Sequence, residues 1–154
     1  MYNRKMSIYL HKSHNVSVLA YHLVCPAKYR KVVFSQKVDQ EMKSICQEIS
    51  DRCQIHFLEI GTDKDHTHFL IQSVPTYAPT KIVRIVKSIT ARAIFARVPE
   101  VKKQLWGGEF WSDGYFISSV GRNGVETAIQ QYVKNQGTEA EYIQLHKDQL
   151  RLFS

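Results

Sequence analysis

Cysteine is scarce in this chain of 154 residues, and long apolar runs are missing altogether. The three cysteines, Cys25, Cys46 and Cys53, are odd in number and form no Cys-x-x-Cys, which predicts reduced, mostly buried thiols in a cytosolic protein. No hydrophobic stretch approaches membrane-spanning length, and residues 1–14 carry charge without an apolar core. We therefore expect neither a membrane partner nor a secretory signal.

Acidic residues are also in the minority, 14 against 21 lysines and arginines, for a net charge of +7. This excess favours a polyanionic partner, and nucleic acid above all. Hydrophobic residues make up 44% of the chain, enough for the core of one domain. We predict a single domain over residues 1–154, with a flexible arm at 1–14 and a mobile helical part at 122–154.

Hydrophobic periodicity predicts an alternation of strands and helices. The expected strands are 16–25, 55–62, 66–72 and 115–120, and the expected helices are 36–53, 80–97, 125–136 and 138–150. We predict that Ser35 and Thr80 cap two of these helices, and that residues 106–111 form an aromatic hairpin with 115–120. The order β-α-β-β-α-β predicts an α+β fold of the ferredoxin-like or RRM-like class, an antiparallel sheet covered by two helices.

The strand at 66–72 carries two histidines with one residue between them. His66 and His68 project from one face while Thr67 projects from the other, and strand geometry puts neighbours on one face roughly 6.5 Å apart. The two imidazoles can therefore converge on one metal ion, although half-exposed sheet histidines are an alternative. Asp63 and Asp65 flank the pair and either orient an imidazole or serve the turn.

The predicted helix at 125–136 carries Tyr132 and Gln136 four residues apart, so both lie on one helical face. A phenol nucleophile and an amide oxygen ligand could reach the same ion. The alternative is an aromatic residue that packs the helix. Two imidazoles with one amide oxygen would suit Mg²⁺ or Mn²⁺, with phosphate and water completing the coordination.

These features together resemble the single-tyrosine HUH transposases of the smallest bacterial insertion sequences, the TnpA-like family. The resemblance also covers YHLVCPAKYR at 21–30 and LWGGEFWSDGYF at 105–116, and it extends from about residue 15 to 137. It implies that His66, His68 and Gln136 bind the metal and that Tyr132 is the nucleophile. One departure is Thr67, where the family usually has a bulky apolar residue; because this side chain faces away from the metal, we expect a small packing effect.

The resemblance further implies the activity and the partners. Such proteins cut and rejoin single-stranded DNA at the ends of their element through a 5′-phosphotyrosine intermediate, and they recognise DNA hairpins near those ends. They act as homodimers in which the tyrosine helix of one subunit can complete the site of the other. Gly121 and Gly124 match the place where that exchange needs flexibility. The expected location is the cytoplasm, on the nucleoid when bound to DNA.

Basic side chains in two segments and one joint are candidates for DNA contact, although solvated surface is an equal alternative. They are Lys28, Tyr29, Arg30 and Lys31 in a loop, Lys81, Arg84 and Lys87 on a helix, and Arg122 at the joint. Two other functions stay open from the residues alone. One is a non-catalytic protein that binds DNA or RNA hairpins, and the other is a metal-dependent phosphodiesterase that uses water as nucleophile.

Overall fold

The structure, a computed structural model, describes residues 10–11, 16–105 and 107–136. The chain forms β1 (Leu10–His11), β2 (Val16–Ser17), β3 (Leu19–Pro26), a 3₁₀ turn η1 (Lys28–Arg30), α1 (Gln36–Arg52), β4 (Ile55–Thr62), β5 (His66–Ser73), α2 (Pro79–Arg97), α3 (Pro99–Gln104), β6 (Phe116–Val120) and α4 (Arg122–Gln136). The predicted element order is confirmed from β3 to α4. The predicted helix at 138–150 and most of the predicted arm lie outside the described residues.

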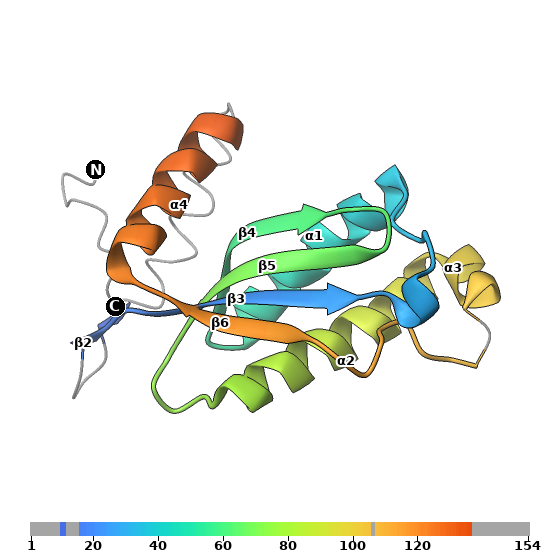
Figure 1. The fold of residues 1–154 in the computed structure, drawn as a ribbon, viewed down its shortest axis with the longest axis horizontal. Helices are drawn as coiled ribbons and strands as arrows, with labels where there is room; N and C mark the ends of the chain where they lie inside the picture. Colours follow the sequence, from blue (N-terminus) through green and yellow to red (C-terminus); the bar gives the residue numbers. More distant parts are fainter. Residues whose placement is uncertain (1–9, 12–15, 106, 137–154) are drawn as a thin grey trace.

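Four strands form one antiparallel sheet in the order β4-β5-β3-β6 (Figure 1). β3 is central, as its apolar composition on both faces suggests, because it pairs with β5 on one side and β6 on the other. In Figure 1, α1 passes behind the strands, and α4 stands at the end of β6. The α+β, ferredoxin-like class predicted from the sequence is confirmed.

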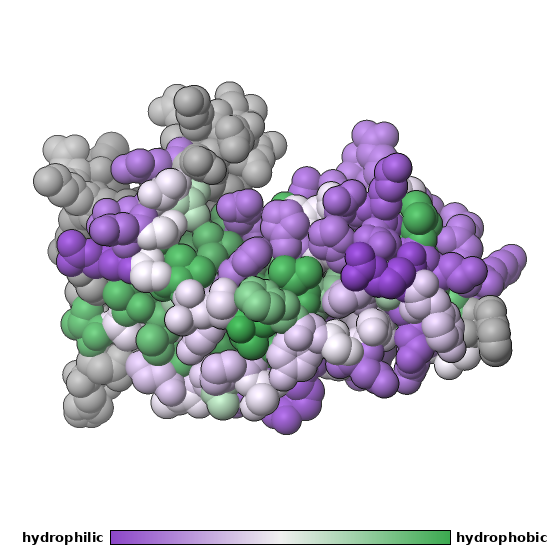
Figure 2. All heavy atoms as spheres, viewed as in Figure 1, coloured by the Kyte–Doolittle hydropathy of each residue, from purple (hydrophilic) through white to green (hydrophobic). Residues whose placement is uncertain are grey.

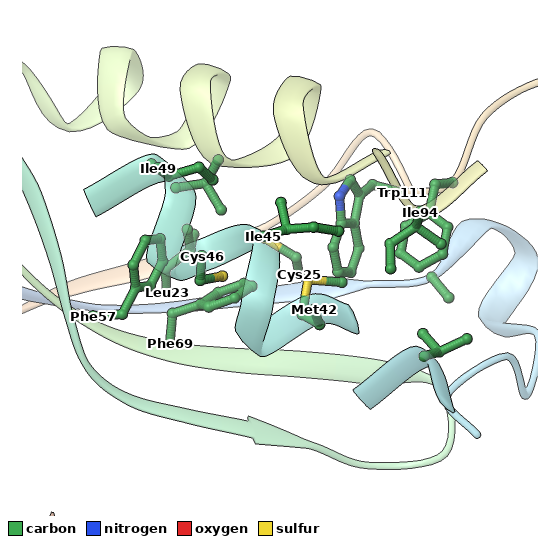
Figure 3. Packing of buried hydrophobic residues seen from close by; sticks show 14 of the residues in the cluster. Leu23, Cys25, Met42, Ile45, Cys46, Ile49, Phe57, Phe69, Ile94 and Trp111 are labelled. Atoms are coloured by element: carbon green, nitrogen blue, oxygen red, sulfur yellow. The ribbon is translucent and has the colours of Figure 1, made fainter. Parts of the chain in front are cut away.

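The main core lies between one face of the sheet and the helices α1 and α2 (Figure 3). The sheet contributes Leu23, Phe69 and Ile71, and each is fully buried. From α1, a single stripe of Val38, Met42, Ile45, Cys46 and Ile49 packs against them. Burial of each large aliphatic or aromatic side chain contributes about 1.5–3 kcal/mol to the free energy of folding. The helix-covered face of the sheet therefore supplies much of the stability of the domain.

The two covering helices start for different local reasons. The Ser35 side chain accepts a hydrogen bond from the Val38 amide at 3.2 Å, which confirms Ser35 as the N-cap of α1. The predicted Thr80 cap is wrong: α2 begins at Pro79, and Ala78 precedes it without a side-chain cap. Proline favours the first helical position because its φ is already helical and because the N–H group that it lacks would have no partner there. The helix can therefore begin without a side-chain cap.

The predicted strand at 16–25 is two strands in the structure. Val16–Ser17 pairs with Leu10–His11 as a separate two-stranded ribbon, and Leu19–Pro26 enters the main sheet. Part of the predicted flexible arm therefore forms β1, while residues 1–9 and 12–15 lie outside the described residues. Within the described ranges, no helix is long and apolar enough to cross a membrane.

The predicted hairpin between residues 106–111 and 115–120 is wrong. Trp111 pairs with Ala27 just beyond β3, and the Ser112 amide donates to the Pro26 carbonyl at 2.9 Å. Phe110 and Trp111 are buried in the core, and the Trp111 indole N–H donates to Thr90 Oγ1. Burial of Phe110 and Trp111 in the core therefore holds the segment before β6 at the end of β3. Strand β6 pairs with β3 instead of with this segment.

Candidate functional site

His66 and His68 lie on the sheet face that α1 and α2 leave uncovered. Thr67, Phe69 and Ile71 are fully buried on the helix-covered face, whereas both histidines are half-buried on the opposite face. The two-residue alternation therefore predicted the orientation of the histidine pair correctly. Thr67 does face away from the pair, as expected for its departure from the family pattern.

Asp65 holds His66 from the turn before β5. Its Oδ1 lies 3.0 Å from His66 Nδ1, and its Oδ2 accepts from Arg30 Nε at 2.9 Å. The hydrogen bond to His66, with that from Arg30, lowers the pKa of the Asp65 carboxyl, so this carboxylate is ionised and acts only as an acceptor. His66 Nδ1 must then donate, which leaves Nε2 as the ring nitrogen for a metal ion.

Asp63 has a different partner from Asp65. Its Oδ1 accepts the Lys64 amide at 2.7 Å, and its own amide donates to the His66 carbonyl. The carboxylate therefore shapes the turn between β4 and β5. Of the two acidic candidates, only Asp65 contacts a histidine ring through its carboxylate.

His68 sits in a row of residues that crosses four strands. Gly61 on β4 pairs with His68, His68 pairs with Val24 on β3, and Val24 pairs with Phe116 on β6. Next to the row, the His22 ring lies 5.9 Å from the His68 ring, centroid to centroid, at 75°. Sequence reasoning missed His22 because its approach depends on the register of β3 against β5, which no local pattern specifies.

Tyr132 and Gln136 both belong to α4, as predicted, but their side chains lie outside the described residues. Side chains in the N-terminal half of α4 are described, and among them Val125 packs with Ala20 and Leu58 on the uncovered face of the sheet. This is the face that carries His66 and His68. Among the described side chains, no three His, Cys, Asp or Glu groups could hold a metal ion together.

The predicted joint at Gly121 and Gly124 is shorter in the structure, because α4 begins at Arg122 and Gly124 lies in its first turn. A Cβ added at Gly121 would meet nothing within 4 Å, whereas one at Gly124 would come within 2.6 Å of Val120 Cγ1. Gly124 therefore serves close packing between β6 and α4, and Gly121 stands in open space. Arg122, a candidate for DNA contact, is exposed, and its Nε lies 3.8 Å from Glu126 Oε1.

The side chains of the basic loop after β3 differ in their contacts and exposure. Lys28 forms a 2.6 Å ion pair with Glu109, which raises the lysine pKa, and Arg30 binds Asp65. Tyr29 and Lys31 are exposed. Tyr29 and Arg30 both adopt the left-handed backbone region, with φ of 58° and 52°, which is uncommon for side chains of this size.

The basic residues of α2 also differ in their contacts. Lys87 Nζ donates to the Ser112 carbonyl at 2.7 Å and so fixes the segment before β6. Lys81 Nζ lies 4.2 Å from the centre of the Tyr77 ring, and Arg84 is exposed. Because α2 covers the opposite face of the sheet, these side chains and the histidine pair lie on different sides of it.

The uncovered face combines apolar and polar surface. Figure 2 shows apolar side chains from the left part of the face seen in Figure 1 to its middle, with mostly polar side chains toward the right. Phe116 is 58% exposed and Tyr115 43% exposed. Phe116 pairs with Val24 and so lies on the face of the histidine pair, where a ligand along the sheet can reach it. The Tyr115 ring instead has Lys87 Nζ of α2 5.6 Å from its centre.

Comparison with known proteins gives the family. The model of the family described as "Transposase IS200 like" matches residues 15–136. This chain belongs to the IS200-like transposases. It is 32% identical to the ISDra2 transposase TnpA of Deinococcus radiodurans over 118 residues, which cover 77% of this chain and 84% of the relative.

Two further proteins are similar to this IS200-like transposase. The transposase for insertion sequence element IS200 of Salmonella typhimurium is 27% identical over 116 residues, 75% of each chain. A crystal structure of a candidate transposase of Deinococcus radiodurans R1 superposes with a TM-score of 0.65 at 28% identity, covering 82% of this chain and 97% of that one. The family match includes every residue predicted to form the site, from His66 to Gln136.

Proposed function

We propose that this IS200-like transposase cuts and rejoins single-stranded DNA through a covalent link to Tyr132, with a divalent cation held by His66, His68 and Gln136. The observation that carries the proposal is the half-buried histidine pair on the open sheet face, with His66 held by Asp65 at 3.0 Å. The family match over residues 15–136 supports the assignment of Tyr132 and Gln136.

The residues present fit a cation. The Asp65 contact occupies Nδ1 of His66, and a carboxylate in that position commonly orients a metal-binding imidazole. Two imidazoles with one amide oxygen accept Mg²⁺ or Mn²⁺ and leave positions open for phosphate and water. When bound, such an ion neutralises charge on a phosphate oxygen as the phosphorus is attacked.

Tyr132 would supply the attacking oxygen. Its phenol loses a proton and forms a bond to phosphorus, the bond from phosphorus to the 3′ oxygen breaks, and that oxygen takes a proton. The products are a 5′-phosphotyrosine and a free 3′-hydroxyl. A phenol of pKa about 10 is a better leaving group than a sugar hydroxyl, so a 3′-hydroxyl can reverse the step and rejoin strands without ATP.

The DNA would lie along the open face of the sheet. Phe116, 58% exposed in the same row as His68, offers a ring on which an unpaired base can stack. Tyr29 and Lys31 are exposed in the loop beside Arg30 and can meet the backbone. We further propose that the DNA carries a hairpin near the element end and that two subunits act together, with Tyr132 serving its own or its neighbour's histidines.

The test is a single-stranded oligonucleotide that carries an end of the element, incubated with the full chain and Mg²⁺ or Mn²⁺. We expect a protein–DNA adduct that survives denaturing electrophoresis and disappears in Tyr132→Phe. Tyr115→Phe is the matched control, because this tyrosine is exposed on the body of the domain and should leave the adduct intact.

Each rival function predicts a different outcome of this experiment. Cleavage that persists in Tyr132→Phe without an adduct would favour a phosphodiesterase that uses water. Salt-dependent binding of the oligonucleotide without cleavage at any metal concentration would favour a hairpin-binding protein. Either outcome would overturn the proposal.

A further inference from the structure

Gly61 stands directly beside the ring of His68. The two residues are register partners on β4 and β5, so their side-chain positions are neighbours on the open face. A Cβ added at Gly61 would lie far inside van der Waals contact with Nε2 and Cε1 of His68 and 3.1 Å from Cδ2. The imidazole therefore occupies the space that any other residue at position 61 would fill.

The ring is also bounded on the side of β3. His22 approaches it edge-on with 5.9 Å between ring centroids. Val24 is the direct partner of His68 on the same strand. The His68 imidazole thus lies between the backbone of β4 at Gly61 and the side chains of β3.

A glycine inside a strand weakens the strand, and it often marks a close approach by another group. The backbone at Gly61 does not require glycine, because only Gly107 and Gly108 have a positive φ among the described glycines. The contact with His68 is the feature of Gly61 that a side chain would disturb. Steric space for the imidazole therefore accounts for glycine at this position.

We propose that Gly61 is a positioning residue for the metal site: its missing side chain sets the orientation in which His68 meets the cation. The inference rests on the proposed function, since it takes His68 as a ligand. Changing a residue that orients a ligand typically lowers metal affinity 10–100-fold. Gly61→Ala should lower Mn²⁺ affinity by about that factor, since the methyl group displaces the ring.

The experiment compares Gly61→Ala with Gly114→Ala in the full chain. Gly114 is a fair control because a Cβ there meets nothing within 4 Å and its φ lies outside the left-handed region. Mn²⁺ affinity is measured by titration calorimetry or by the loss of the free-ion EPR signal. The ring signals of His66 and His68 are followed by NMR in the metal-free protein, which reports orientation without depending on catalysis.

For Gly61→Ala we expect displaced His68 ring signals, little change at His66 and weaker Mn²⁺ binding, with Gly114→Ala matching the parent. Parent-like His68 signals and parent-like affinity in Gly61→Ala would overturn the inference. If the parent itself binds no Mn²⁺, the proposed function fails, and the metal-free His68 signals still test the contact with Gly61.

A double variant keeps the test sharp if Gly61→Ala fails to fold. Gly61→Ala combined with His68→Ala removes the ring that the new methyl group would strike, so this protein should regain the folding of His68→Ala alone. If the double variant also fails to fold, glycine is needed for the backbone of β4, and the inference is wrong.

Discussion

Two buried threonines should respond in opposite directions to the same substitution. Thr67, between the two histidines, is fully buried, and its Oγ1 has no hydrogen-bond partner within the described part of the chain. Thr90 on α2 is also fully buried, but its Oγ1 donates to the Val86 carbonyl at 2.6 Å and accepts from Trp111 Nε1 at 2.9 Å. Threonine to valine replaces a hydroxyl with a methyl group of similar size at both positions.

The expected changes in the free energy of unfolding depend on which buried polar groups each variant leaves without a hydrogen-bond partner. An unsatisfied buried polar group costs about 1–3 kcal/mol. Thr67→Val removes such a group, so we expect the free energy of unfolding to rise by about 1 kcal/mol, equivalent to about 2–4 °C in Tm for a domain of this size. Thr90→Val creates one, because the Trp111 N–H loses its acceptor, and should lower the free energy of unfolding by about 1–3 kcal/mol.

The assay is urea unfolding at one pH, followed by tryptophan fluorescence and by circular dichroism, with the midpoint compared at an unchanged slope. Because Thr67 faces away from the histidines, Thr67→Val should also keep Mn²⁺ affinity within about twofold, well below the 10–100-fold change expected for residues that orient ligands. A lower midpoint for Thr67→Val, or the same sign for both variants, would refute the reasoning.

Three further predictions concern the site, the core thiol and the basic loop. Asp65→Ala should weaken Mn²⁺ binding about 10–100-fold, because His66 loses the carboxylate that orients it. Asp63→Ala should leave Mn²⁺ affinity unchanged, because its carboxylate contacts only the turn. Equal effects of the two variants in a Mn²⁺ titration would contradict the role given to Asp65. Burial raises the pKa of the Cys25 thiol to about 12, so its contribution to stability is complete below the usual value near 8.5 and is lost as pH rises toward 12. Urea midpoints between pH 7 and 11 should fall with pH in the parent and fall less steeply in Cys25→Ala, where the buried Cys46 thiol, whose pKa is also raised, still contributes. Lys31→Ala should lower the affinity for single-stranded DNA and reduce the slope of log affinity against log salt by about 1, the value for one lost phosphate contact. Lys28→Ala should have a smaller effect, because the Lys28 ammonium is paired with Glu109. Filter binding at several salt concentrations measures both changes, and equal effects would contradict the prediction.

Features that depend on local periodicity were predictable from the sequence. The alternation in β5 placed Phe69 with the core and the histidines on the other face, because side-chain direction in a strand has a period of two. The buried stripe of α1, from Val38 to Ile49, followed from helical spacing, and Ser35 capped the helix as its side-chain chemistry suggests.

Features that depend on pairing between distant segments were not predictable. The neighbours of His68, Gly61 and His22, come from two other strands whose register no local pattern specifies. The aromatic segment before β6 looked like a hairpin strand, but burial of Trp111 and its bond to Thr90 drew it to the end of β3. Lys87 was expected on open surface, and its bond to the carbonyl of that same segment could not be foreseen.

The central position of β3 has a consequence for how the chain is made. Val24 pairs with His68 on one side and with Phe116 on the other, so one edge of this strand must wait for a partner that emerges roughly 90 residues later. At about 5–20 residues per second on the ribosome, that wait lasts on the order of 5–20 s. During this interval the nascent domain has an open, largely apolar strand edge, which is the stage at which it is most exposed to misassembly.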